Sequence, residues 1–404
     1  MALLPVADAL AQILGDVKPV DSEMVPIADA AGRTLAAPLA ATRTQPPFPA
    51  SAMDGYAVRS ADVATVPAQL RLIGMSAAGH GFSGTVGPGE TVRIFTGAPV
   101  PAGADAIVIQ EDVDADGERI VAKESSRSGR HIRRAGLDFE TGQILLETGR
   151  RLDARAVGLA AAMGHATVSV RRKPRVAILA TGDELVPPDV TPGPDQIVVS
   201  NTYAVATLVH AAGGEAIDLG VAADNFAALE NAIHKAREAK VDILVTTGGA
   251  SVGDHDLVQS ALTKEGMALG FWQIAMRPGK PLMSGALGAM RILGLPGNPV
   301  SSYVCCLLFV TPLIRALQGD PRAGEDSSEA ATLAADMPAN DKRQEYARAL
   351  LSRDALGRLI ATPVNTQDSS ITRLLSDAGA LIIRAPFAPP AKSGDACRVI
   401  RLLD

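Results

Sequence analysis

The sequence predicts an α/β protein built of several domains, and three observations support this prediction. The 404 residues exceed what one hydrophobic core normally serves, so we expect two to four domains. From Arg175 to Gly319, strand-like and helix-like segments alternate, which is typical of a parallel α/β sheet. Residues 46–140 and 327–404 instead contain short β-like runs separated by turn-forming residues, which indicates two smaller β domains.

The first half of the chain is predicted to hold a β insert within a helical domain. Residues 1–45 and 141–172 are rich in Ala and Leu, with helical periodicity in "LPVADALAQIL" and "LDARAVGLAAAMG". Between them, residues 46–140 contain the strand-like runs "QLRLIGM", "TVRIFTG" and "AIVIQEDV" and a hairpin turn at "DADG". We therefore expect the flanking pieces to meet as one discontinuous connecting domain.

The α/β domain is expected to span residues 173–322. Its buried strands are predicted by "RVAILATGDEL", "VDILVTTGG" and "MRILGLPGNP", and its helices run from Asn201 to Ala212 and from Asn225 to Ala239. A closing helix in "VSSYVCCLLFVTPLIRALQG" ends at Gly319. A polar linker, "DPRAGEDSSEAA", then leads to the C-terminal β domain at 327–404.

Composition and charge narrow the class of protein. Hydrophobic residues make up 47% and charged residues 20%, as in ordinary globular chains, and the net charge of −6 argues against general binding to nucleic acid or an anionic membrane. Asp8 and Asp16 interrupt the N-terminal apolar segment, so no signal peptide is expected, and the run from Tyr303 to Val310 is short for a membrane span. Three cysteines without CxxC spacing fit a reducing cytoplasm.

Two loops that follow predicted strands combine glycines with carboxylates. Glycines allow backbone N–H groups to approach a phosphate, and carboxylate oxygens suit a divalent metal. Alone, either loop would be a turn with a helix-capping acid, whereas two at consecutive strand ends favour a ligand site. The first, "LATGDELV", supplies Asp183 and Glu184. The second, "TTGGASVGDHD", supplies Gly248, Gly249, Ser251, Asp254 and Asp256.

Two further stretches of the α/β domain suit an anion. In "MRPGKP", Arg277 and Lys280 lie three residues apart on a proline-stiffened turn and could direct two cations at one oxyanion. In "GLPGNPVSS", Asn298 can cap a helix whose first turn holds Pro299, and free N–H groups at such a start attract anions. By itself this second pattern is more often that of a structural helix start, and the neighbouring basic turn is what favours a functional role.

In "PPFPASAMDGYAV", prolines and a glycine surround one carboxylate, Asp54. An Asp-Gly pair often only caps a turn. The alternative is an acid held rigid so that it meets charge arriving from another surface. A second stiffened loop, "RIFTGAPVPAGAD", supplies Thr96 and Gly97.

Other common chemistries lack their motifs. The six histidines have no paired metal-ligand spacing, although His255 lies in the acidic loop. The chain contains no GxSxG motif, no Walker loop and no Rossmann fingerprint. Serine hydrolysis, P-loop ATP hydrolysis and dinucleotide redox chemistry therefore lose support.

Together, the ordered stretches resemble the molybdopterin molybdenumtransferase (MoeA) family, which includes the gephyrin E domain. The resemblance covers nearly the whole chain, and its most specific pieces are SAMDGYA and LPGNPVS. The stretches that carry it are "PPFPASAMDGYAV", "IFTGAPVPAGADAIV", "ILATGDEL", "SNTYAVATL", "TTGGASVGDHD", "FWQIAMRPGKPL" and "GLPGNPVSSYV".

The resemblance implies a homodimer of four-domain subunits. It also implies a reaction in which adenylylated molybdopterin and molybdate, with Mg²⁺, give molybdenum cofactor and AMP. The family's cleft lies between the α/β domain of one subunit and the β insert of the other, so Asp54 would be presented across the dimer interface. Contact with the molybdopterin adenylyltransferase that makes the substrate is a further implied partnership.

The resemblance assigns roles to particular residues. The implied catalytic residues are Asp54, Thr96, Glu184 and Asp256, and Mg²⁺ would be held by Glu184, Asp224 and Asp256. The implied molybdopterin or AMP contacts are Asp138, Gly248, Gly249, Ser251, Asp224, Pro296, Asn298 and Pro299. The implied molybdate site consists of Arg277, Lys280, Pro281, Ser301, Arg348 and Ser369.

Some questions stay open at this stage. Gln273 and Arg277 stand where many relatives of the family have lysines, so one cation is lost and the other becomes a planar guanidinium. A nucleotide pyrophosphatase on the same sheet and a peptide-binding scaffold are the rival hypotheses. The preference for molybdate or tungstate and the number of Mg²⁺ ions are not readable from the sequence.

Overall fold

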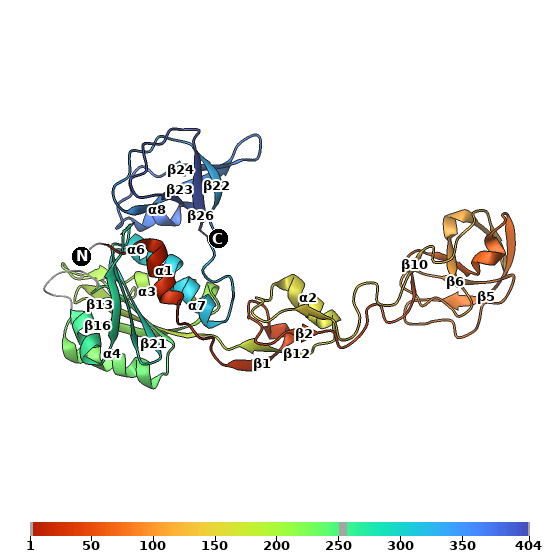
Figure 1. The fold of residues 1–404 in the computed structure, drawn as a ribbon, viewed down its shortest axis with the longest axis horizontal. Coiled ribbons are helices and arrows are strands. Elements are labelled where there is room, and N and C mark those ends of the chain that lie inside the picture. Colours follow the sequence, from red (N-terminus) through yellow and green to blue (C-terminus); the bar gives the residue numbers. More distant parts are fainter. Residues whose placement is uncertain (1–2, 250–256, 403–404) are drawn as a thin grey trace. The chain divides into compact units, whose positions relative to one another are not determined.

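The computed structural model describes residues 3–249 and 257–402, so Ser251 and Asp256 lie outside the described residues. The chain forms two compact units, each with its own core (Figure 1). One unit comprises Met24–Ala31 and Ala37–Ser169, and the other comprises Met1–Glu23, Gly32–Ala36 and Val170–Asp404. We call them the insert unit and the sheet unit.

The insert unit is built around a twisted sheet with the strand order β7-β4-β6-β5-β9-β8. All its pairs are antiparallel except β5 with β6, and β8 and β9 form the hairpin predicted at "DADG". The sheet strands are β4 (Gly55–Val58), β5 (Ala68–Ser76), β6 (Glu90–Ile94), β7 (Ala106–Ile109), β8 (Val113–Asp116) and β9 (Arg119–Ala122).

Short elements complete this half of the chain. The helix α2 (Ala154–Ala162) begins at Asp153, whose carboxylate accepts a hydrogen bond from the backbone N–H of Ala156 at 2.9 Å. The remaining elements are β1 (Ser22–Pro26), η1 (Ile27–Asp29), β2 (Leu39–Ala40), β3 (Ala50–Ser51), η2 (Ser60–Val63), η3 (Gln110–Asp112), β10 (Ile132–Arg133), β11 (Ile144–Leu146) and β12 (Thr167–Arg171).

The sheet unit contains the expected α/β sheet, with the strand order β16-β13-β17-β21-β20-β18. Strand β13 pairs in parallel with β16 and β17, and β17 pairs in parallel with β21, whereas β20 and β18 add an antiparallel edge. The strands are β13 (Arg175–Thr181), β16 (Glu215–Ala222), β17 (Ile243–Thr247), β18 (Ala268–Gln273), β20 (Pro281–Leu287) and β21 (Met290–Leu295). A separate parallel pair is formed by β14 (Leu185–Val186) and β15 (Ile197–Val198).

Helices cover both faces of this sheet, because successive side chains of its buried strands point to opposite sides. Val176 and Ile178 of β13 pack with α3 (Asn201–Ala211) and the closing helix, while Ala177 and Leu179 pack with α4 (Phe226–Glu238) and α5 (Leu257–Lys264). The predicted helices from Asn201 and Asn225 are confirmed, and the Asn225 side chain caps α4 by accepting from the Ala228 N–H.

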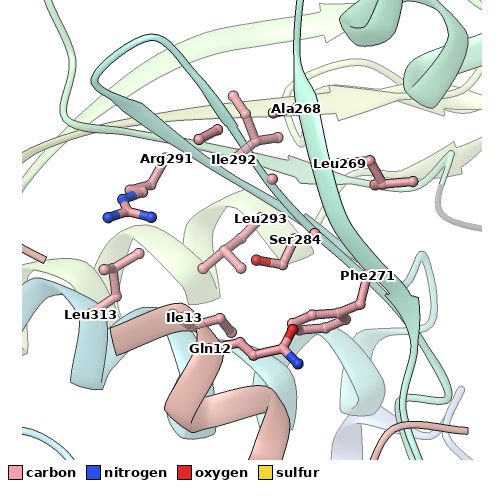
Figure 2. Close-up of a pocket in the computed structure, with 13 residues that line it drawn as sticks. Gln12, Ile13, Ala268, Leu269, Phe271, Ser284, Arg291, Ile292, Leu293 and Leu313 are labelled. Atoms are coloured by element: carbon pink, nitrogen blue, oxygen red, sulfur yellow. The ribbon is translucent and has the colours of Figure 1, made fainter. Parts of the chain in front are cut away.

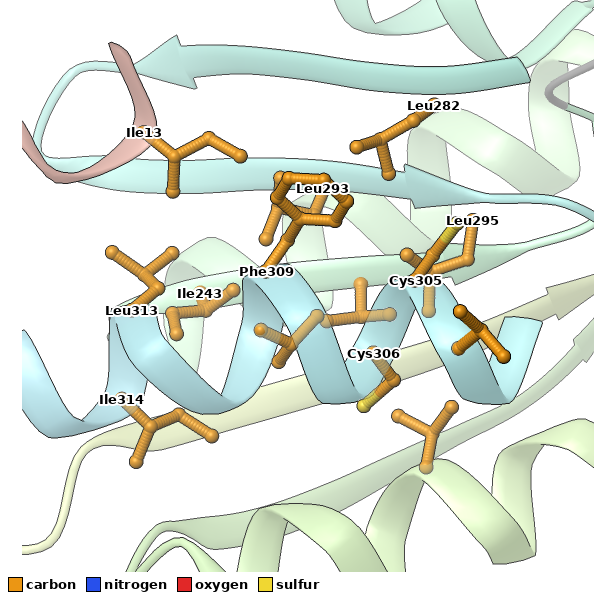
Figure 3. Close-up of a cluster of buried hydrophobic side chains, with 14 of the residues drawn as sticks. Ile13, Ile243, Leu282, Leu293, Leu295, Cys305, Cys306, Phe309, Leu313 and Ile314 are labelled. Carbon is orange, nitrogen blue, oxygen red and sulfur yellow. The ribbon is translucent and has the colours of Figure 1, made fainter. Parts of the chain in front are cut away.

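The closing helix runs from Pro299 to Leu317 as α6 (Pro299–Cys305), a π-helical turn η4 (Cys306–Val310) and α7 (Thr311–Leu317). Among the described helices it is the one long and apolar enough to cross a membrane, but 61% of its most apolar stretch is buried inside the protein. Phe309, Cys305 and Leu313 pack against Leu293 and the neighbouring strands (Figure 3). Its apolar character is therefore that of a core helix.

The first helix differs from our expectation. We placed residues 1–45 in the connecting domain, but α1 (Val6–Leu14) packs on the core of the sheet unit, where Ala9 and Ile13 are buried with Leu313 (Figure 3). Helical periodicity marks an apolar face and does not specify which surface covers it.

The C-terminal segment closes into a β-barrel. The order β23-β24-β22-β26-β25 returns to its start because β25 also pairs with β23. A short strand, β19 (Met276–Arg277), joins the α/β sheet region to the barrel through β23. The barrel elements are β22 (Glu329–Leu333), β23 (Gln344–Arg353), β24 (Leu359–Pro363), α8 (Thr372–Ser376), β25 (Ala380–Arg384) and β26 (Ala396–Arg401).

The buried Phe309 provides a test of this core. We expect Phe309→Ala to lower the free energy of unfolding by about 3–5 kcal/mol, because the lost ring leaves a cavity. Urea unfolding followed by the fluorescence of Trp272, the single tryptophan and a residue of β18, would measure the change. Phe387→Ala, at a ring that is 75% exposed, is the control and should change stability by less than about 0.5 kcal/mol. Equal losses in both variants would contradict the proposed core role.

Candidate functional site

A cavity of about 650 Å³ lies at the carboxyl ends of β13, β17 and β21. Such strand ends are where open parallel sheets bind ligands. The cavity brings together residues from all four predicted stretches of the α/β domain, together with Ser370 from the C-terminal domain. The predicted residues that line it are Glu184, Asp224, Gly248, Gly249, Pro281, Pro296, Asn298 and Pro299.

A smaller hollow of about 230 Å³ lies elsewhere, between α1 and the strands β18, β20 and β21 (Figure 2). Its walls are largely apolar, with Ile13, Leu269 and Phe271 among them, and Arg291 is the charged residue among its described lining. None of the predicted site residues that lie within 3–249 and 257–402 lines it. We therefore assign the ligand chemistry to the 650 Å³ cavity.

The glycine turn after β17 requires glycine for two reasons. Gly248 and Gly249 have φ values of 94° and 59°, which L side chains rarely adopt. A Cβ atom at Gly248 would also lie 2.6 Å from the carbonyl oxygen of Thr181, and one at Gly249 would lie 2.3 Å from a methyl carbon of Val258. The turn can therefore bring bare backbone to the wall of the cavity.

Three carboxylates gather at the cavity, where Glu184 and Asp224 line it and Asp183 contacts the Asp224 backbone. The Asp183 carboxylate accepts a hydrogen bond from the backbone N–H of Asp224 at 3.0 Å, which fixes the loop that carries Asp224. Partial burial, followed by the charges of Asp183 and Glu184, raises the pKa of Asp224. A cation would relieve this repulsion between like charges, and carboxylate oxygens are the donors that Mg²⁺ takes alongside substrate phosphates.

The described residues do not form a complete protein metal site. No group of three or more His, Cys, Asp or Glu side chains within residues 3–249 and 257–402 could hold a metal ion. Glu184 and Asp224 nevertheless fit Mg²⁺, since this ion is usually held by only one or two carboxylates together with the phosphates of its substrate.

Thr181, which our sequence reasoning missed, ends β13 beside the glycine turn. The residue lines the cavity, and its buried hydroxyl has no hydrogen-bond partner among the described residues. Cβ atoms built at Gly248 and at Gly249 would each lie 3.1 Å from this hydroxyl. A polar atom in a protein interior normally has a hydrogen-bond partner, so this hydroxyl is available to a ligand in the cavity.

A loop of the C-terminal domain reaches the start of the closing helix. The carbonyl of Ser369 accepts the N–H of Val300 at 3.1 Å, and its hydroxyl accepts from the Asn298 amide at 3.0 Å. Asn298 occupies the N-cap position, as we expected, but its side chain makes no capping bond and binds Ser369 instead. Ser370, which we did not predict, is the serine of this loop that lines the cavity.

Arg348 fixes the position of the loop that carries Ser369 and Ser370. Its side chain is almost fully buried and donates hydrogen bonds to the carbonyl oxygens of Ile371, Asp368 and Thr366 at 2.9, 2.8 and 3.2 Å. Burial lowers the pKa of this guanidinium, against the opposing charge of Asp368. Arg348 does not line the cavity, and its hydrogen bonds are used to position residues 366–371.

The two cations of "MRPGKP" have different environments. Arg277 donates to the carboxylate of Glu345 at 2.6 Å and to Asn340 at 3.3 Å, and lies 3.8 Å from the carboxylate of Asp341. Lys280 is exposed and forms no ion pair with any described residue, and its neighbour Pro281 lines the cavity. Lys280 is therefore the cation of this turn that is available to an anion, whereas Arg277 joins the α/β domain to the barrel.

In the insert unit, Asp54 and Thr96 form a compact pair. The Asp54 carboxylate accepts the backbone N–H and the hydroxyl of Thr96 at 2.7 and 2.8 Å. These two bonds, with a smaller contribution from the charge of Arg93, lower the pKa of Asp54. The acid therefore ties two loops together rather than capping its own turn, and it stays ionised at neutral pH.

Arg93 is a residue of this region that the sequence analysis did not predict. Its guanidinium lies over the rings of Tyr56 and Phe95, 4.9 and 5.1 Å from their centroids. Asp138 belongs to the same unit, where its backbone N–H donates to Gln45 at 3.0 Å, but no described contact joins it to Asp54.

The unpaired hydroxyl of Thr181 leads to a prediction about stability. Thr181→Val keeps the side-chain shape and removes the unpaired group, so the free energy of unfolding should rise by about 1 kcal/mol. Urea unfolding monitored at Trp272 would report this. Thr181→Ser retains the hydroxyl and should show no gain. A less stable Val variant would indicate that the hydroxyl has a partner in the folded chain.

The Asp54–Thr96 pair leads to a second prediction. Thr96→Val removes one of the two bonds that favour the ionised acid, so the pKa of Asp54 should rise toward its ordinary value. Because the pKa is lowered in the wild type, the ionised state should persist to a lower pH there than in the variant. Carboxyl-carbon NMR titration of both proteins would measure the difference, with Asp153, whose lowered pKa comes first from its hydrogen bond with the Ala156 N–H, as an internal control. An unchanged Asp54 titration would contradict the assignment.

Comparison with known proteins identifies the family. Residues 4–164 match the MoeA N-terminal region (domain I and II), residues 177–316 a probable molybdopterin binding domain, and residues 330–402 the MoeA C-terminal region (domain IV). A molybdopterin molybdenumtransferase of Bacillus subtilis is 34% identical over 98% of this chain and 94% of its own length. One from a Nostoc species is 39% identical over 81% and 76% of the respective chains.

A solved structure extends the similarity to the whole fold. A molybdopterin biosynthesis MoeA protein from Pyrococcus horikoshii is 30% identical and superposes with a TM-score of 0.83, covering 99% of both chains. This chain therefore belongs to the MoeA family of molybdopterin molybdenumtransferases.

Proposed function

We propose that the chain inserts molybdenum into adenylylated molybdopterin, using molybdate and Mg²⁺, and releases AMP as molybdenum cofactor forms. Molybdenumtransferase activity follows from the family, and the identity of the substrates is our proposal. The observation that supports it best is the meeting of Gly248 and Gly249 with Glu184 and Asp224 around one cavity. Bare backbone and carboxylates in one place suit a pyrophosphate carried with a divalent cation.

Glu184 and Asp224 are proposed to hold Mg²⁺ together with Asp256, which lies outside the described residues. When bound, the ion would neutralise the pyrophosphate and assist the departure of AMP. The Asp183 carboxylate positions the Asp224 backbone for this role through its hydrogen bond. The phosphate oxygens can be bound by the glycine turn, Gly248 and Gly249, and by the hydroxyl of Thr181. Ser251 is a further proposed contact.

Molybdate, the second substrate, is proposed to bind beside Lys280 and Pro281. Its two negative charges require cations, and Lys280 is free of ion pairs with the described residues. The proposed hydroxyl contacts are Ser301, which is buried in the first turn of the closing helix and does not line the cavity, and Ser369, whose loop contacts that turn. Arg348 and Arg277 act on this site indirectly, by fixing the Ser369 loop and by joining β19 to the barrel.

We further propose that a homodimer completes the site, with the Asp54–Thr96 pair of one protomer meeting the cavity of its partner. Asp54 is held by two hydrogen bonds and is ionised at neutral pH. A group that receives a cation or a proton must have this charge. Phe48 and Met53 beside it are 40% and 41% exposed, and such apolar side chains fit a surface that becomes covered. A cytoplasmic location and delivery of the substrate by a molybdopterin adenylyltransferase complete the proposal.

Release of AMP from adenylylated molybdopterin tests the function directly. With purified protein and Mg²⁺ we expect AMP release to depend on molybdate and to stop when Mg²⁺ is chelated. NAD and ADP-ribose, supplied without pterin, should yield no AMP. AMP from those substrates would support a pyrophosphatase instead. Failure to release AMP, combined with capture of a peptide partner, would support a scaffold.

Asp54→Asn is expected to lower cofactor formation by about 100-fold or more, because a group that receives charge or a proton is lost. The fold should be unchanged, since the amide oxygen can still accept from Thr96. Asp114→Asn, on the exposed β8–β9 hairpin, is the matched control and should retain full turnover. Wild-type turnover in Asp54→Asn would remove Asp54 from the mechanism.

A further inference from the structure

The 230 Å³ hollow beside α1 has a chemistry of its own, apart from the 650 Å³ cavity that holds the predicted site residues (Figure 2). Two rows of paired residues on β18, β20 and β21 form one side of it. In the first row, Ala268 pairs with Ala286, and Ala286 pairs with Arg291. Two of the three side chains in this row are single methyl groups, so the row leaves space next to α1.

The second row adds apolar side chains and one hydroxyl. Leu293 pairs with Ser284, and Ser284 pairs with Phe271. The register shifts between Leu269 and Phe271, which makes Gly270 an extra residue on β18. A bulge of this kind changes the alternation of side chains by one residue. Phe271 therefore lies on the face of the sheet that packs with the core around Leu293.

Helices close the hollow on the other side with buried apolar side chains. These are Ile13 of α1 and Leu313 of α7. An apolar cavity of about 150 Å³ is enough for benzene, so a hollow of about 230 Å³ suits a ligand of about nine non-hydrogen atoms. The space is therefore that of a small molecule with an apolar body.

Arg291 gives the hollow a positive charge that no described residue balances. Its side chain is partly buried, and it forms no ion pair or hydrogen bond with any residue in 3–249 and 257–402. Within the same ranges, the hydroxyl of Ser284 and the amide of Gln12 also have no hydrogen-bond partner. A partly buried guanidinium without a carboxylate beside it attracts an anion.

The charge and shape of the hollow favour a carboxylate over a phosphate. The planar fork of a guanidinium binds both oxygens of a carboxylate, whose single negative charge balances that of Arg291. A phosphate carries up to about two negative charges at neutral pH and would need further cations, which the described lining does not offer. The apolar walls would in turn cover the hydrocarbon part of an organic acid.

We propose that this hollow binds a small organic monocarboxylate of about nine non-hydrogen atoms. The carboxylate binds the guanidinium of Arg291, and the ring or short chain packs between Ile13 and Leu293. The hydroxyl of Ser284 and the amide of Gln12 can donate further hydrogen bonds to the carboxylate. This binding is independent of the reaction proposed above, because none of the described residues assigned to that reaction lines the hollow.

Benzoate, which has this size, is the probe for a test on the wild type. In ligand-observed NMR titrations, the Kd for benzoate should be at least about tenfold lower than the Kd for benzamide, which lacks the charge, and for acetate, which lacks the ring. Nuclear Overhauser contacts should place the benzoate ring beside the methyl groups of Ile13 and Leu313. Equal affinities for benzoate and benzamide, contacts elsewhere, or displacement of benzoate by inorganic phosphate would overturn the proposal.

A pair of variants tests the role of the guanidinium. In Arg291→Gln we expect the Kd for benzoate to rise about tenfold or more and the Kd for benzamide to stay unchanged, because the charge is lost. Arg237→Gln removes the same charge from α4, which covers the opposite face of the sheet, and should bind benzoate as the wild type does. Equal Kd values for benzoate in the two variants would contradict the assignment. If Arg291→Gln does not fold, the comparison of ligands on the wild type decides.

Discussion

The parallel pairing of β17 with β13 and β21 is the constraint on which the site depends. Because the strands run in the same direction, Thr181, Thr247 and Leu295 end at one edge of the sheet, and the loops that follow them must share one space. The two helical layers bury both faces, so the open edge is where polar loops can meet solvent and ligand. Backbone direction, rather than any single side chain, thus creates the cavity.

The charged and the uncharged groups of the cavity suit different parts of a ligand. Carboxylates would repel the anionic substrates that we propose, and the charges of Asp183 and Glu184 add to partial burial in raising the pKa of Asp224. In the proposed reaction, the acids therefore need a cation between them and the phosphates. Anions need different partners, which the backbone of the glycine turn and the hydroxyl groups of the lining can provide, with Lys280 next to the lining residue Pro281.

The C-terminal barrel contributes to the site mainly by fixing the position of loops and less by lining the cavity itself. Arg348 uses its guanidinium on three carbonyl groups and thereby presents Ser369 and Ser370 at the start of the closing helix. The pair of Arg277 with Glu345 joins the barrel to the turn that carries Lys280. A buried guanidinium is costly unless its N–H groups are satisfied, so the loop and the arginine support one another.

The sequence alone determined the α/β class, the strand ends that carry Glu184 and the glycine turn, and the family, since these depend on local periodicity and on residues close together in the chain. Only the tertiary structure decided that α1 packs on the sheet, that Thr181 is unpaired, that Arg277 is bound to Glu345 and that Ser370 enters the cavity. The physical reason is the same in each case. The type of a residue and its spacing in the sequence indicate what it can bind. Its actual partner comes from a distant segment that only folding brings within hydrogen-bond or packing distance.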